Sequence, residues 1–173
     1  MKDTPERLFQ GRFLEVVRDG RWEYVRRVNT RGAVFVLAIT AARELILVEQ
    51  FRVPMQARTL ELPAGIYGDA DSPPDETPEA CALRELEEEA GYTASHACVL
   101  IKGPVAPGLT SEMLYLVEAT GLTRTGAGGG VGGEDIVVHV VPLAGVKDWL
   151  ARKAAEGLLV EPRVYSALYF VGK

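Results

Sequence analysis

The sequence predicts an α/β fold in which a mixed β-sheet is sandwiched between α-helices. Segments of strand length outnumber helical segments, and the helices do not alternate strictly with the strands as they would in a doubly wound fold. In addition, 47% of the 173 residues are hydrophobic, and no change in composition marks a second domain. We therefore expect one domain that spans residues 1–173.

The first strands are predicted by apolar patterning and by a turn signal. Residues 13–17 and 22–28 have the pattern of strands, and Asp19-Gly20 between them is a pair favoured in hairpin turns. Residues 33–40 form a continuous apolar run, which is typical of a strand buried on both faces. Two more strands complete this half of the chain, at 44–51 and around 59–62.

A helix with its own start and stop signals follows within residues 76–92. Thr77 suits the N-cap, Pro78 suits the first helical position, and Gly91 is placed to end the helix. The apolar residues gather on one face of this helix: Leu83, Leu86 and Ala90. Three carboxylates gather on the opposite side: Glu85, Glu88 and Glu89.

This density of carboxylates suggests a metal site. Like charges at helical spacing destabilise a helix unless a cation lies among them. Carboxylate oxygens are ligands that Mg²⁺ and Mn²⁺ prefer. An isolated acidic string of this kind is, however, also typical of a solvated surface helix, so the residues alone leave both interpretations open.

The second half of the chain predicts three strands and two closing helices. The strands are expected at 97–102, 113–118 and 135–141, and the helices at 143–156 and 161–170. Residues 126–133 are rich in glycine and contain a GxGxxG string, but they lead into a strand and not into a helix, which argues against dinucleotide binding. We predict a mobile loop here, with Glu134 and Asp135 at its end.

The acidic helix resembles the signature of the Nudix hydrolases. The residues in register with that signature are Glu76, Arg84, Glu85, Leu86, Glu88, Glu89, Gly91 and Tyr92. Only the leading glycine departs, because Gly65 is separated from Glu76 by ten residues instead of five. We interpret the difference as a five-residue insertion within 66–75.

The resemblance covers nearly the whole chain and implies the Nudix fold and the branch that cleaves ADP-ribose and related nucleoside diphosphate sugars. The segments that carry it are 21–27, 48–52, 61–65, 106–111 and 162–166, and Pro107 stands sixteen residues after Gly91. The implied reaction is Mg²⁺-dependent hydrolysis, with Mn²⁺ as a possible replacement, to a nucleoside monophosphate and a sugar phosphate. Alternatives are the same chemistry on GDP-mannose, sanitation of oxidised nucleotides, a nucleotide-binding module without catalysis, and an acidic scaffold protein without a ligand.

The resemblance also implies roles for individual residues. The expected metal ligands are Glu85, Glu88, Glu89 and the backbone carbonyl of Ala64. The expected catalytic residues are Glu134 as the base, with Asp135 and Glu112 as fallbacks, Glu88, and Arg84, which pairs with Glu76 to fix the helix and its loop. For substrate binding, the resemblance implies Phe13 and Trp22, which would stack on the base, and the segment with Pro107 and Gly108. Glu23, beside Trp22, is expected to contribute to base specificity. Arg27 and Arg52 are further candidates, because local arginines can reverse the sign of the charge inside the pocket of an acidic protein.

Charge and patterning restrict the partners. The net charge of −5 argues against a nucleic-acid partner, because phosphate-backbone binding needs clustered Lys and Arg. No run of eighteen apolar residues and no apolar N-terminal stretch occurs, so we expect a cytoplasmic protein without a membrane partner. The resemblance implies a homodimer in which the strands within 1–30 cross to the partner and complete its site, while 31–173 form the catalytic core.

Overall fold

The structure, a computed structural model, describes residues 4–69 and 72–172. The ends of the predicted domain, residues 1–3 and 173, and two residues of the predicted insertion, 70–71, lie outside the described residues. The described elements are β1 (Glu6–Gln10), β2 (Leu14–Asp19), β3 (Trp22–Arg27), β4 (Gly32–Ala38), β5 (Glu44–Arg52), a 3₁₀ turn (Val53–Met55), β6 (Ala57–Glu61), β7 (Ala64–Tyr67), α1 (Pro78–Ala90), β8 (Tyr92–Pro104), β9 (Met113–Arg124), β10 (Ile136–Pro142), α2 (Val146–Ala155), β11 (Leu159–Val160) and α3 (Pro162–Leu168).

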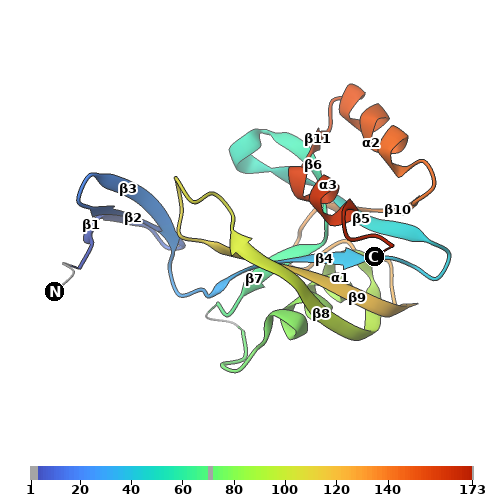
Figure 1. The fold of residues 1–173 in the computed structure, drawn as a ribbon, viewed down its shortest axis with the longest axis horizontal. Helices are drawn as coiled ribbons and strands as arrows, with labels where there is room; N and C mark the ends of the chain where they lie inside the picture. Colours follow the sequence, from blue (N-terminus) through green and yellow to red (C-terminus); the bar gives the residue numbers. More distant parts are fainter. Residues whose placement is uncertain (1–3, 70–71, 173) are drawn as a thin grey trace.

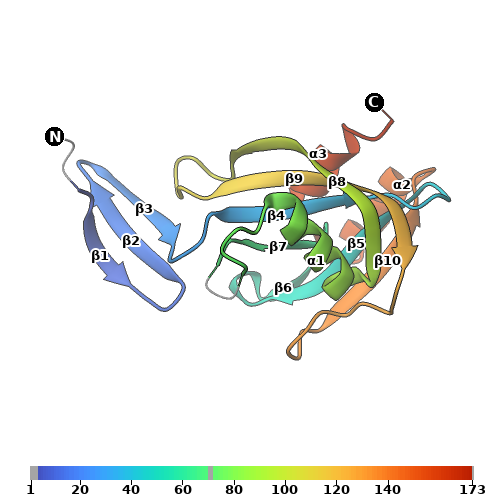
Figure 2. The same ribbon diagram turned by 90° about the horizontal axis from the view of Figure 1, so that it is seen from below.

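Two mixed four-stranded sheets form the body of the molecule, where the sequence predicted one mixed sheet. Their strand orders are β10-β5-β6-β11 and β7-β4-β9-β8, and each contains one parallel pair, β6 with β11 and β4 with β9. Helix α1 packs against strands of both sheets, and α2 packs against β10 and β11 (Figures 1 and 2). The predicted α/β class with a mixed arrangement is therefore confirmed, but its strands are divided between two sheets.

Strand β4 supplies both halves of the hydrophobic core. All seven of its residues are buried, which confirms the strand predicted at 33–40 as buried on both faces. Because side chains alternate along a strand, Phe35 and Leu37 join the cluster that contains Leu150 of α2, whereas Val34 and Val36 join the cluster under α1. The acidic helix is thus held against the same strand that anchors the rest of the fold.

The predicted elements are present, with three short strands missed. Thr77 caps α1 by accepting a hydrogen bond from the Ala80 N–H at 3.2 Å, and Gly91 ends it in the left-handed conformation. Strands β8 and β9 extend well beyond the predicted 97–102 and 113–118, because they pair from Tyr92–Arg124 to Pro104–Met113, past the end of the apolar alternation. The missed strands are β1, β7 and β11, whose partners in the sheet lie far away in sequence or whose residues are polar.

The strands β1, β2 and β3 form a separate antiparallel sheet at one end of the molecule (Figure 1). It touches the body through backbone hydrogen bonds between Val25 and the turn after β8, at 2.9 Å to Leu109 and 3.2 Å from Ser111. Large apolar side chains on this sheet are exposed: Leu8, Phe9, Phe13, Leu14 and Trp22. The hairpin predicted around Asp19-Gly20 is confirmed, since β2 and β3 pair up to Asp19 and Trp22.

Candidate functional site

The acidic face of α1 is turned into the protein and meets β7. Glu89 is buried, and its carboxylate accepts a hydrogen bond from the Ala64 N–H at 2.9 Å. Glu85, one helical turn earlier, lies directly against Gly65, where a Cβ would stand 1.9 Å from its Oε1 atom. Gly65 is therefore required because any side chain would occupy the place of the Glu85 carboxylate. The sequence predicted a loop here, but Ala64 and Gly65 belong to β7, whose pairing with β4 fixes both contacts.

Arg84 connects three carboxylates of the same region. Its guanidinium lies 3.4 Å from Glu76, 2.8 Å from Glu85 and 3.3 Å from Glu88. Glu76 is buried and also accepts a hydrogen bond from the Gly68 N–H at 3.3 Å. The predicted ion pair between Glu76 and Arg84 is confirmed, and it fastens the loop after β7 to the helix.

The two inward carboxylates are poorly compensated. Burial raises the pKa of Glu85 to about 7 and that of Glu89 to about 8, because little solvent remains to stabilise their charge. Repulsion from Glu85 also raises the pKa of Glu89, repulsion from Glu88 raises that of Glu85, and Glu134 adds to both. Arg84 opposes the rise at Glu85. A cation placed among these groups would remove the unfavourable charge.

Carboxylate and carbonyl oxygens are suitable ligands for a hard divalent cation. Within residues 4–69 and 72–172, however, no three His, Cys, Asp or Glu side chains lie close enough together to hold a metal ion as they stand. The Arg84 guanidinium donates instead to one oxygen atom each of Glu85 and Glu88. Buried carboxylates with raised pKa values and oxygen-only ligands fit Mg²⁺ or Mn²⁺ better than softer metals.

The cavity beside these carboxylates has a volume of about 890 Å³. Glu85, Glu89 and Glu134 line it together with Ala64 and Gly65. The lining also contains three arginines, one from each of three distant segments: Arg27, Arg52 and Arg163. A cavity lined by both carboxylates and arginines can bind a metal together with phosphate oxygens.

Each of these arginines is held by a carboxylate. Arg52 makes a bidentate pair with Glu61, at 2.8 and 2.7 Å. Burial opposes ionisation of Glu61, but hydrogen bonds from Arg52 and Thr59 nevertheless lower its pKa, so the pair stays charged. Arg27 pairs with Glu112, which also lines the cavity.

Arg163 and Gln50 line the cavity but were assigned no role from the sequence. Arg163 pairs with Glu161 at 2.5 Å and lies 3.8 Å above the centre of the Phe35 ring. Gln50 is only 8% exposed, and its Nε2 atom is buried without a hydrogen-bond partner among the described residues. The sequence did offer a signal for Gln50, because it is a polar residue two positions after Val48 and therefore lies on the same buried face of the strand. A buried amide without a hydrogen-bond partner is costly unless a ligand supplies one.

The glycine-rich segment runs along the end of α1 before it reaches Glu134. The N–H groups of Gly129 and Gly130 donate to the carbonyls of Glu89 and Glu88 at 2.8 and 3.0 Å, and a Cβ on Gly128 would stand 2.5 Å from the Glu89 carbonyl oxygen. The prediction of a mobile loop is corrected for this part, because the glycines permit close contact with the helix end. Glu134 then lines the cavity and accepts a hydrogen bond from the Val131 N–H at 3.0 Å.

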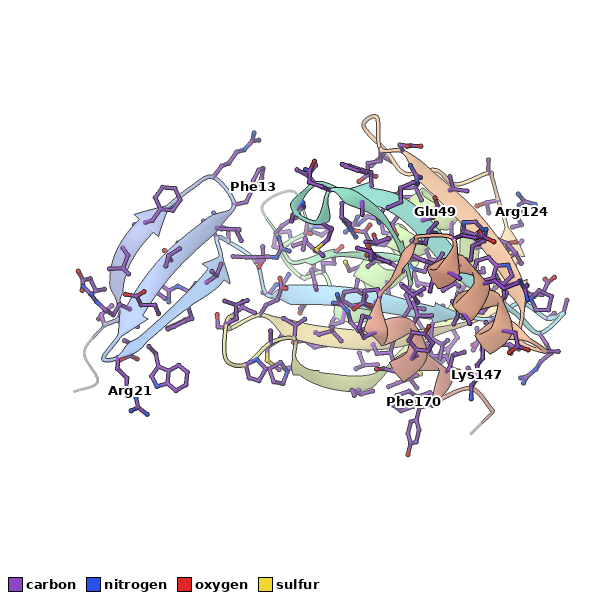
Figure 3. All side chains as sticks on the ribbon, turned by 90° about the horizontal axis from the view of Figure 1, so that it is seen from above. Phe13, Arg21, Glu49, Arg124, Lys147 and Phe170 are labelled. Carbon is purple, nitrogen blue, oxygen red and sulfur yellow. The ribbon has the colours of Figure 1, made fainter. Side chains whose placement is uncertain are left out.

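Several predicted site residues lie elsewhere within the single chain. Asp135, a fallback for the base, pairs with Arg58 at 2.7 Å and does not line the cavity. Five predicted substrate-binding residues also do not line the cavity: Phe13, Trp22, Glu23, Pro107 and Gly108. Figure 3 places Phe13 on the N-terminal sheet, outside the body, where its side chain is 65% exposed.

None of the helices in the described part of the chain is long and apolar enough to span a membrane.

Comparisons with known proteins agree on the nature of this domain. A family model described as the NUDIX domain matches residues 29–157. A crystal structure described as an ADP compounds hydrolase superposes with a TM-score of 0.71 at 27% identity, covering 99% of this chain and 94% of that chain.

Curated relatives match at about one third identity. The chain is 34% identical over 144 residues to the methanol dehydrogenase activator of Bacillus methanolicus, covering 80% of this chain and 75% of that protein. It is 34% identical over 124 residues to the ADP-ribose pyrophosphatase of Bacillus subtilis (strain 168), covering 68% of this chain and 64% of that protein. It is 32% identical over 136 residues to the GDP-mannose pyrophosphatase of Enterobacter sp. (strain 638), covering 74% and 66%.

Proposed function

The chain belongs to the NUDIX family, and on that premise we propose that it hydrolyses the diphosphate of ADP-ribose or a related nucleoside diphosphate sugar. Water is added across the P–O–P anhydride, so the products are a nucleoside monophosphate and a sugar phosphate. The observation that carries this proposal is the cavity whose lining combines Glu85, Glu89 and Glu134 with Arg27 and Arg52.

Glu85 and Glu89 would hold the metal, with Glu88 and the Ala64 carbonyl as further ligands. Bound there, Mg²⁺ or Mn²⁺ would neutralise the charge that develops on the phosphate oxygens. Ala64 already donates its N–H to Glu89, which orients that carboxylate before a metal binds. Arg84 keeps α1 and the loop after β7 together through Glu76.

The remaining chemistry is assigned to other residues that line the cavity. Arg52 and Arg27 would bind the diphosphate, since an arginine already oriented by a carboxylate loses little freedom when it binds phosphate. Glu134 would accept the proton of the attacking water, because it lines the same cavity and comes from a segment fixed on the end of α1. Glu112 is the fallback base, but its pairing with Arg27 favours a role in phosphate binding.

The first experiment is a substrate panel with Mg²⁺: ADP-ribose, ADP-glucose, GDP-mannose and UDP-glucose, with kcat/KM for each. The proposal expects the highest value for an ADP-sugar and no turnover in EDTA. GDP-mannose is the second candidate, because relatives of that activity match at 32% identity. A lead for GDP-mannose would replace the first candidate. Binding of a panel member with no turnover would support a nucleotide-binding module instead.

Sanitation of oxidised nucleotides is a less favoured alternative. The cavity of about 890 Å³ has room for an extended substrate with a group on both sides of the diphosphate. Turnover of 8-oxo-dGTP above that of every nucleotide sugar would favour the alternative.

A homodimer belongs to the same proposal. Phe13, Trp22 and Glu23 lie on a sheet that projects from the body and exposes apolar side chains, which a second subunit would cover. We infer that this sheet delivers the base-stacking residues to the partner's cavity, with Pro107 and Gly108 in the adjoining turn.

The prediction of a cytoplasmic location is retained.

Mixed dimers test the exchange. Glu85→Gln and Trp22→Ala subunits are each expected to be nearly inactive as homodimers. When the two are unfolded and refolded together, a trans arrangement restores one intact site in each mixed dimer, so activity returns to about a quarter of wild type. A cis arrangement leaves one defect in every site and restores nothing. Light scattering after size exclusion verifies that dimers form.

A further inference from the structure

Arg58 makes several hydrogen bonds on the face of its sheet that points away from the cavity. It lies on β6, between Ala57 and Thr59, and Thr59 lines the cavity. Because side chains alternate along a strand, Arg58 points to the opposite face. There its guanidinium binds Glu49 of β5 at 2.6 Å and the side chain of Asp135 at 2.7 Å, and it also donates to the Asp135 carbonyl at 3.3 Å.

Arg58 is itself held in place by a chain of contacts under α2. Glu49 is half-buried and receives, besides Arg58, a hydrogen bond of 2.9 Å from His139 of β10. The His139 ring meets the edge of Trp149 on α2, with ring centres 5.3 Å apart. Figure 3 labels Glu49, which lies among the strands of the body and not on the N-terminal sheet. The guanidinium is therefore fixed on a packed part of the sheet.

Asp135, the residue that Arg58 holds, directly precedes β10 and directly follows Glu134. Asp135 stands on the outer face with Arg58, whereas Glu134 lines the cavity on the inner face. The two contacts to Asp135, one to its carboxylate and one to its carbonyl, fix both the side chain and the backbone at this point. Fixing the backbone of one residue determines the face to which its neighbour points.

The segment that carries Glu134 is thus attached at both ends. At the start, Gly129 and Gly130 are bonded to the carbonyls of Glu89 and Glu88 on α1. At the other end, Arg58 holds Asp135. We propose that Arg58 is a positioning residue for Glu134, which it holds at a set distance from the metal-binding face of α1 by clamping Asp135 on the opposite side of the sheet. This inference rests on the proposed role of Glu134 as the base.

A stabilising surface ion pair is the competing explanation, and the two make different predictions. The Asp135 side chain is 78% exposed, and exposed ion pairs contribute little to stability. A pair that served stability alone would change the melting temperature slightly and kcat not at all. A pair that positions the base would lower kcat while leaving KM, metal binding and the melting temperature nearly unchanged, since small misplacements of a catalytic group are costly.

The test is a double-mutant cycle between Arg58 and Glu134, measured on the full chain with its best nucleotide sugar. We expect Glu134→Gln to lower kcat about 100- to 10,000-fold. Arg58→Met should lower kcat about 10- to 100-fold, with KM within about twofold of wild type. In the double variant, Arg58→Met should cost less than about a further twofold, because it acts only through a base that is already absent. Arg58→Lys and Asp135→Asn should fall between wild type and Arg58→Met.

Controls separate the possible failures. Glu156→Gln removes another ion pair, Lys153 with Glu156 at 2.7 Å, but keeps Lys153 itself, which lies over Trp149, and it should leave kcat unchanged. Mn²⁺ binding followed by electron paramagnetic resonance should be the same in Arg58→Met and wild type. If Arg58→Met does not fold, Asp135→Asn gives the answer, since an exposed carboxamide is isosteric with the carboxylate.

The outcomes are distinct. If Arg58→Met and Asp135→Asn both have the kcat of wild type, the positioning role is overturned. It is also overturned if the double variant loses the product of the two single losses in kcat, those of Arg58→Met and Glu134→Gln. A Glu134→Gln variant as active as wild type overturns the assignment of the base, and with it this inference. Lack of turnover by the wild-type protein refutes the proposed function itself.

Discussion

Gly65→Ala is a minimal change that tests whether Glu85 has to occupy its observed place. In the structure, a Cβ at this position would stand 1.9 Å from Oε1, 2.0 Å from the carboxylate carbon and 2.4 Å from Cγ of Glu85. Most of the Glu85 side chain, not only its tip, is therefore in the way. The backbone of Gly65 is held by the pairing of β7 with β4, so the side chain of Glu85 has to move.

The required displacement follows from contact distances. An ordinary van der Waals contact begins at 3.4 Å, so Oε1 has to retreat by about 1.5 Å. Misplacement by about 1 Å can cost about a hundredfold in rate. We expect kcat/KM of Gly65→Ala to fall at least about a hundredfold, with a loss of Mg²⁺ affinity. The melting temperature of the metal-free protein should change little, because moving a poorly compensated carboxylate towards solvent offsets the lost contacts.

The assay is AMP release from ADP-ribose over a range of Mg²⁺ concentrations, with the melting temperature measured with and without metal. Gly103→Ala, in β8, is the matched control, because a Cβ there meets nothing within 4 Å. It should behave as wild type. Normal activity of Gly65→Ala at ordinary Mg²⁺ concentration would refute the reasoning, since it would mean that Glu85 can serve the reaction from another position.

Three further predictions concern Glu89, Gly128 and Gln50. Burial raises the pKa of Glu89 to about 8 from 4.5, so the folded metal-free protein binds more protons than the unfolded chain between these values, and its stability falls as pH rises through this window. Glu89→Gln should therefore have a higher melting temperature than wild type in EDTA at pH 8 but not at pH 4.5. A difference in melting temperature between the two proteins that does not change with pH would contradict the assignment. Gly128→Ala should separate the glycine-rich segment from α1, because its φ is +70° and a Cβ would stand 2.5 Å from the Glu89 carbonyl oxygen; kcat should fall about tenfold or more, and unchanged kinetics would show that the contact is dispensable. Gln50→Leu should raise KM for the nucleotide sugar about tenfold while leaving the melting temperature the same or higher, because a buried amide without a partner would bind substrate at a cost in stability; an unchanged KM would remove Gln50 from the site.

The sequence by itself determined the local elements and the acidic helix. Thr77, Pro78 and Gly91 mark the two ends of α1, and the apolar run of β4 predicted burial on both faces, because capping and side-chain alternation depend only on neighbours in the chain. The spacing of Glu85 and Glu89 on one helical face was predictable for the same reason. Glu134 was identified through the resemblance, and Arg27 and Arg52 through the need for positive charge in the pocket of an acidic protein. All three line the cavity.

Only the tertiary structure decided what those residues face. Gly65 meets Glu85 because β7 pairs with β4, a contact between segments that the sequence could place only as a loop. The glycines from 126 to 133 indicated flexibility in the sequence, but several of them permit close packing on the end of α1. Arg58 and Asp135 are 77 residues apart, and their pairing depends on sheet order. Such contacts form between elements distant in the chain, so local spacing carries no information about them.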